Sequence, residues 1–148
     1  MKKKLKVLAL FDAISATTID QDLSAELATP DWKTESNVLN ALRELGHATE
    51  YLAIFDDLDL VQQKLQQFEP DIIFNLADQF KNNRAFDQNI VSFLAMRGIA
   101  FTGCGSTGLT LCKHKAISKK ILGYHRIHTP AFVTIARGKR IARPKHLR

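Results

Sequence analysis

The sequence has little cysteine: among its 148 residues only Cys104 and Cys112 are cysteines. One lies in a glycine-rich turn and the other in a predicted helix, so they form neither a disulfide framework nor a zinc-ligand pattern. We therefore expect reduced thiols, a cytoplasmic location and no bound metal. Both side chains are expected to pack as small, partly buried groups.

Long apolar runs are also missing. No stretch approaches the ~20 consecutive apolar residues that a membrane-spanning helix needs. Met1 is followed by three lysines, as at the start of a signal peptide, but Asp12 ends the next apolar run after a few positions. These absences argue against a membrane partner and against secretion.

Acidic residues are absent from the C-terminal part of the chain, where none follows Asp87. The stretch 137–148 has no acid and six basic residues, which account for the whole formal net charge of +6. Residues 1–136 are therefore formally neutral. Because the charge is confined to one short end without interleaved aromatic residues, it argues against nucleic acid as a partner.

The chain does contain an alternation of apolar runs and helical stripes. Nearly continuous apolar runs predict buried parallel strands at 5–11, 48–55, 71–76 and 100–102, with a fifth at 131–135. Apolar residues at helical spacing predict helices at 34–45, 58–68, 90–97 and 107–124. Thr34 is expected to cap the first helix, while Gly46 and Pro70 are expected to end the first and second.

This order of elements predicts an α/β fold, a three-layer parallel sheet with helices on both faces. Ligands of such sheets bind at the carboxyl ends of the strands. Here those ends are Asp12 onward, residues 56–57, residues 75–86 and residues 103–106. The acidic residues at 56, 57 and 59 are interpreted as charges that favour a helix N-terminus.

Gly103, Gly105 and Gly108 spell G-x-G-x-x-G, a pattern of dinucleotide-binding sites. In those sites the turn follows the first strand of its unit, and an acidic residue lies ~20 positions further on. Here the turn follows the fourth predicted strand, and residues 123–130 contain no acid. We interpret Gly103 and Gly105 as permitting a tight strand-to-helix turn.

Four segments follow one another in order: DIIFNL at 71–76, GIAFTG at 98–103, H-K-x-x-x-K with Lys115 and Lys119, and IHTP at 127–130. With their spacing, they resemble the amino-terminal domain of D-alanine–D-alanine ligases and their ATP-grasp relatives. In that family the last three segments read G-I-P-Y-T-G, D-K-x-x-x-K and G-I-P-T-P. The resemblance implies a Rossmann-like pre-ATP-grasp domain at 1–127, with 128–148 as the start of a truncated ATP-grasp domain or a basic tail.

The resemblance also implies a function, as part of a ligase that phosphorylates a carboxylate with ATP and Mg²⁺ and then joins it to an amine. In that family the lysine matching Lys115 contacts ATP phosphate, a role suited to a long ammonium side chain. The alternative for Lys115 is a solvated helix face. The candidates for a substrate wall are Asp12, Ser15, Asn75, Asp78 and Gly103.

The D-alanine-binding residues of that family are not found. The loop after the third strand lacks His-Gly and Gly-Glu-Asp-Gly, and the loop that begins at Asp12 has no matching glutamate. The family's magnesium ligands lie beyond this domain, and no acid follows Asp87 here. We therefore expect no catalytic residue, no metal site and no tightly bound cofactor in this chain alone. The substrate pair of the intact protein is expected to differ from two D-alanines.

Two other functions stay open. The domain can be a non-catalytic interaction module, because the resembled family dimerises through this domain and a homodimer is expected. The basic stretch 137–148 can instead bind nucleic acid, which ranks last. His125 and His128 straddle a predicted helix end with no acid nearby, so they are not predicted to form a metal site.

Overall fold

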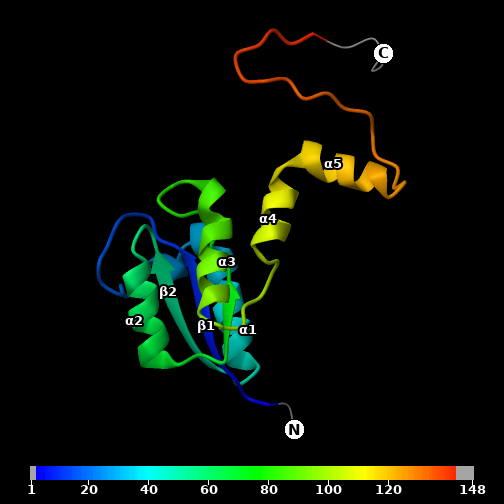
Figure 1. The fold of residues 1–148 in the computed structure, drawn as a ribbon. Helices are drawn as coiled ribbons and strands as arrows, with labels where there is room; N and C mark the ends of the chain where they lie inside the picture. The colour runs from blue at the N-terminus through cyan, green and yellow to red at the C-terminus, as the bar shows by residue number, and fades with distance from the viewer. Residues whose placement is uncertain (1–2, 143–148) are drawn as a thin grey trace. The chain divides into compact units, whose positions relative to one another are not determined.

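The computed structural model describes residues 3–142. The chain divides into two compact units between Ser106 and Thr107 (Figure 1). The predicted domain boundary after residue 127 lies within the second unit and stays a prediction. Of the basic residues predicted to form a tail, Arg143, Lys145 and Arg148 lie outside the described residues.

A three-stranded parallel sheet forms the centre of the first unit. β1 (Lys6–Asp12) is the middle strand, between β2 (Ala48–Ile54) and β3 (Ile72–Asn75). It pairs with β2 from Lys6 to Asp12 and with β3 from Val7 to Leu10. Its five central residues are all buried, as a continuous apolar run predicts for a strand covered on both faces.

Helices pack on both faces of this sheet. On one face, Leu8 and Leu10 belong to a buried cluster with side chains of α2 (Leu58–Phe68) and α3 (Asp87–Met96). On the other, Ala9 and Phe11 belong to a cluster with Leu39 of α1 (Lys33–Glu44). The α/β class with a parallel sheet is thus confirmed, while the three-layer, Rossmann-like pre-ATP-grasp assignment stays a prediction.

The ends of α1 and α2 show which local signals were interpreted correctly. α1 ends before Gly46, which has φ +80° as expected, but it begins at Lys33 rather than after Thr34. Its start is earlier because the 3₁₀ turn η2 (Pro30–Trp32) leads directly into the helix, and the predicted cap at Thr34 is wrong. The Asp57 carboxylate caps α2, and α2 ends at a left-handed Glu69 before Pro70.

The predicted strand at 100–102 is reduced to a single bridge between Ile73 and Phe101. Ile73 forms backbone hydrogen bonds with Ala100 and Thr102, both 2.9 Å, and the strand pairing does not continue beyond them. Gly98 and Gly103 have left-handed φ values of +69° and +99°, so the chain turns away on both sides of these few residues.

The predicted helix at 107–124 is broken into α4 (Ser106–Lys113) and α5 (Lys115–Tyr124). His114 between them has a non-helical ψ of 73°. The Ser118 hydroxyl donates to the Leu111 carbonyl, which a continuous helix would have bonded to the Lys115 N–H. The predicted strand at 131–135 is wrong, because β3 is the last strand within the described residues.

The two remaining 3₁₀ turns, η1 (Glu26–Ala28) and η3 (Arg84–Phe86), lie in the loops after β1 and β3.

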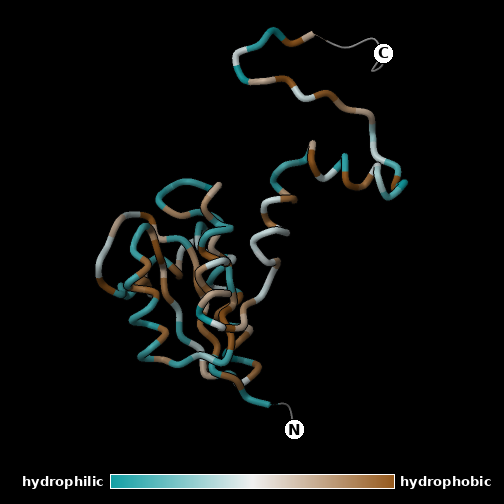
Figure 2. The backbone as a smooth tube through the Cα atoms, viewed as in Figure 1, coloured by the Kyte–Doolittle hydropathy of each residue, from teal (hydrophilic) through white to brown (hydrophobic). Residues whose placement is uncertain are grey.

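Hydrophilic and hydrophobic residues alternate along the helices (Figure 2). Among the residues the structure describes, no helix is long and apolar enough to cross a membrane.

Candidate functional site

The carboxyl ends of β1 and β3 bring Asp12 and Asp78 together. Asp12 is the last residue of β1, and Asp78 follows β3 by three positions. The N–H groups of Asp78 and Gln79 donate to the two carboxylate oxygens of Asp12 at 3.4 Å each. Two residues that are far apart in sequence, and were both predicted as substrate wall, therefore lie together at the expected edge of the sheet.

This pairing changes the acidity of Asp12. The pKa of Asp12 is raised from 3.8 to about 7. Burial of the carboxyl group is the largest cause, and a side-chain hydrogen bond with Asp78 and the charge of Asp78 act in the same direction, while the two backbone N–H donors act against them. Asp12 can therefore accept or release a proton near neutral pH. A cation placed beside Asp12 would favour its ionised form.

Asn75 and the segment beginning at Thr102 form the neighbouring part of the edge. The Asn75 N–H donates to the Thr102 hydroxyl at 3.1 Å, and the Asn75 side-chain oxygen accepts from the Ala77 N–H at 3.3 Å. Gly103 follows directly with its left-handed φ. Asn75 and Gly103 thus lie at the same edge, as the sequence predicted.

The two other predicted residues, Ser15 and Lys115, are both exposed. Ser15 is exposed in the loop after β1. Lys115 is exposed at the start of α5, in the second unit. The neighbouring Lys119 has a local role, since its ammonium donates to the Pro130 carbonyl at 3.3 Å and lies 5.2 Å from the centre of the Phe132 ring.

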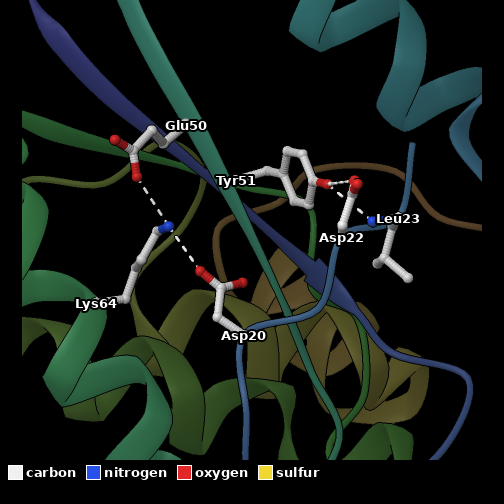
Figure 3. Close-up of polar contacts among 6 residues, drawn as sticks. All are labelled: Asp20, Asp22, Leu23, Glu50, Tyr51 and Lys64. Carbon is white, nitrogen blue, oxygen red and sulfur yellow. Dashed lines mark hydrogen bonds and ion pairs between the residues drawn. The ribbon is translucent and has the colours of Figure 1, made fainter.

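A second polar group lies in a cleft of ≈330 Å³ beside β2. Lys64 of α2 reaches Asp20 of the loop after β1 at 2.7 Å and Glu50 of β2 at 2.8 Å (Figure 3). Burial lowers the pKa of Lys64, but hydrogen bonds and charges from the two acids outweigh this effect and raise it. We call Asp20, Glu50 and Lys64 the Lys64 cluster.

The same loop is held a second time, by Tyr51 of β2. The Tyr51 hydroxyl accepts from the Leu23 N–H at 2.9 Å and donates to the Asp22 carboxylate at 3.2 Å (Figure 3). Hydrogen bonds from Ser24 and Tyr51 lower the pKa of Asp22. The loop after β1, which leads away from the candidate site, is therefore fixed to β2 and α2.

Sequence reasoning missed the Lys64 cluster, although a signal was present. Lys64 lies three residues after Val61 and next to Leu65, both buried, so it stands beside the apolar stripe of α2. A lone lysine at the border of such a stripe indicates an acidic partner on another element. Its two partners come from separate segments, and spacing along the chain does not identify them.

Replacement of Lys64 by methionine keeps most of the apolar stem and removes the charge. It is expected to lower the free energy of unfolding by about 1 kcal/mol, because Asp20 and Glu50 lose their shared partner. Urea denaturation measures this, and the difference should shrink in 1 M salt. The exposed control Gln66→Met should change little; equal effects of both variants would contradict a role for the ion pairs.

The cysteines differ from expectation. Cys104 and Cys112 are both free thiols, but both are exposed rather than partly buried. Cys104 lies in the open glycine turn, and Cys112 lies on α4, where no buried residues occur. Within residues 3–142, no group of three or more His, Cys, Asp or Glu residues is arranged to hold a metal ion.

Comparison with known proteins gives one distant similarity. The chain is 29% identical over 116 residues to Uncharacterized protein y4sG of Sinorhizobium fredii (strain NBRC 101917 / NGR234). The alignment covers 74% of this chain and 34% of y4sG, so the chain spans about a third of the length of the curated relative it matches. No protein-family model matches the chain, and no solved structure does.

Proposed function

We propose that this chain is the amino-terminal, Rossmann-like pre-ATP-grasp domain of an ATP-dependent carboxylate–amine ligase of the D-alanine–D-alanine ligase-like type. The observation that carries the proposal is the pairing of two family-like segments. Ile73 of DIIFNL bridges Phe101 of GIAFTG, and Asn75 bonds to Thr102. The similarity to a relative of which the chain spans 34% supports a domain within a longer protein.

The proposed reaction has two steps. A carboxylate oxygen of the first substrate attacks the γ-phosphorus of ATP and ADP leaves; the amine of the second substrate then attacks the acyl carbon and phosphate leaves, which forms the amide. ATP supplies the activation of the carboxylate. Most of the work for the protein is positioning and neutralisation of charge.

In this proposal the carboxyl edge of the sheet forms part of the substrate wall. Asp12 provides a carboxyl group of raised pKa beside Asp78, and a substrate ammonium would favour the ionised form of Asp12. Asn75, Ser15 and Gly103 complete the wall as predicted from the sequence. The domain positions substrate, while catalytic groups come from the rest of the longer protein.

Lys115 fits a phosphate. Its side chain is exposed at the start of α5, and no described carboxylate forms an ion pair with it. An exposed ammonium on a flexible stem can reach a phosphate oxygen as a point charge. The described residues do not fit Mg²⁺ in the same way, because no group of three acids or histidines converges. We therefore assign the Mg²⁺ ligands to the rest of the longer protein. As the family resemblance implies, we expect that protein to be a cytoplasmic homodimer.

An alternative function as a non-catalytic dimerisation or interaction module has one observation in its favour. α5 leaves Ile117 and Ile121 exposed, at 44% and 40%, and Tyr124 at 84%. Exposed apolar side chains of this size are typical of interaction surfaces when they are adjacent. Sedimentation at micromolar concentration tests this function, and a clean monomer counts against it.

The proposed function is tested with a longer gene product that carries this segment. Incubated with ATP, Mg²⁺ and a mixture of amino acids, it should release ADP in amounts that depend on the amino acids. An enzyme that releases no ADP with any amino-acid mixture would not be this ligase.

A further inference from the structure

An apolar pocket of ≈230 Å³ lies in the first unit, and one of its walls belongs to the loop that contains Asp78. It is formed by the start of α2, the loop after β3 and the start of α3. Its walls are almost entirely apolar, with a single amide, and consist of Leu58, Phe80, Phe86, Asn89 and Ile90. The proposed function assigns no role to any of these five residues.

The pocket is preformed, because the loop that provides one wall is tied to its surroundings. The Lys81 N–H donates to the Phe55 carbonyl at 2.6 Å, and Phe80 and Asn83 exchange two backbone bonds of 3.2 and 3.0 Å. On the other side Ile90 is 1% exposed and fixed in the core. Phe86, at 43% exposed, leaves the pocket open to solvent.

The surroundings indicate what kind of ligand would use it. Asp78, whose N–H donates to Asp12, precedes Phe80 by two residues, so one loop contributes both an apolar wall and an exposed carboxylate, which pairs with Arg84 at 3.4 Å. A dry apolar cavity of about 150 Å³ is large enough to hold benzene. A pocket of ≈230 Å³ therefore has room for one branched aliphatic or aromatic side chain, but not for a nucleotide.

We propose that this pocket binds the apolar side chain of an amino-acid substrate, of leucine or phenylalanine size, whose ammonium lies toward Asp12 and Asp78. The identity of the ligand as a substrate rests on the proposed function. The binding itself is a property of this chain and can be measured without ATP. The proposal makes the pocket a determinant of specificity for the larger apolar amino acids.

The test is a titration of the isotope-labelled chain, followed by backbone amide chemical shifts, with leucinamide, phenylalaninamide and glycinamide, each chiral amide as both enantiomers. At least one enantiomer of leucinamide or phenylalaninamide should shift the amides of Phe80, Phe86 and Asn89. It should bind ~10- to 100-fold more tightly than glycinamide, as burial of such a side chain predicts.

Two variants locate the binding. Asn89→Trp fills the pocket from an exposed position and should abolish the preference for the larger amides over glycinamide. Met96→Trp places the same side chain at the other end of α3, where Met96 is 80% exposed, and should leave that preference intact. Phe86→Ser removes the wall at the mouth and should weaken binding ~10-fold, which provides a second test should Asn89→Trp disturb folding.

Equal affinity for glycinamide and both larger amides would overturn the proposal, as would an undiminished preference in folded Asn89→Trp or Phe86→Ser. This outcome is separate from failure of the ligase function. If the chain binds leucinamide but the longer protein releases no ADP, the pocket stands and the ligase falls. If ADP release is as efficient with glycine as with leucine and phenylalanine, the ligase stands and the pocket falls.

Discussion

Replacement of Lys115 by alanine is expected to lower the rate of ATP turnover by the longer protein by ~100-fold, the usual loss when one positioned charge on a transferring phosphoryl group is removed. The reason is that charge develops on the phosphate oxygens during transfer, and Lys115 presents an exposed ammonium at the start of α5. Steady-state release of ADP, measured with saturating amino acids, gives the rate directly.

The matched control is Lys120→Ala, because Lys120 is also exposed on α5 and its loss changes net charge equally. It should alter turnover less than ~3-fold, within the range of screened surface electrostatics. Lys115→Arg keeps the charge and should recover part of the rate. If both alanine variants behave alike, Lys115 is a solvated helix residue and its assignment to phosphate fails.

Replacement of Asp12 by asparagine is expected to stabilise the protein above neutral pH. The folded-state pKa of Asp12 is raised, so its favourable contribution is fully present below pH ~4 and is lost as pH rises through about 7. A shift of this size corresponds to at most about 4 kcal/mol. Because the carboxyl is only half-buried, we expect a gain on the order of 1–2 kcal/mol at pH 8.

Urea denaturation of both proteins at a series of pH values measures this effect. The stability difference should open between pH ~4 and ~8 and should be largest at the alkaline end. Asp31→Asn, which removes an exposed carboxylate, is the control and should give no such trend. A difference between Asp12→Asn and wild type that does not vary with pH would contradict a raised pKa of Asp12 in the folded protein.

The sequence was sufficient for the elements with the strongest periodicity. The apolar run LKVLALF predicted β1, because a strand buried on both faces needs apolar side chains at every position. The apolar stripe from Leu58 to Phe68 predicted α2. The predicted helices and strands were wrong where a contact that leaves no periodic pattern in the sequence decides the structure. The helix break at His114 involves the Ser118 hydroxyl, and the strand predicted at 100–102 is cut short by two left-handed glycines.

Prediction of the candidate site depended on topology rather than on motifs. Asp12, Asn75 and Asp78 were predicted because parallel strands end at one edge, and the structure brings them there. Neither the contact between the two carboxyl groups nor the raised pKa of Asp12 is visible in the sequence, since both depend on where the loop after β3 folds back. The Lys64 cluster joins three separate segments for the same reason.

The measurement that tests the central claim most directly follows a carboxylate oxygen through the reaction. The longer protein is incubated with ATP, Mg²⁺ and amino acids whose carboxyl groups carry oxygen-18, and the phosphate released is analysed by mass. If the carboxylate attacks the γ-phosphorus, each phosphate released on amide formation carries one labelled oxygen, and its amount matches the ADP. Phosphate free of label, released together with ADP, would show that the carboxylate is not phosphorylated and would contradict the assignment to a carboxylate–amine ligase.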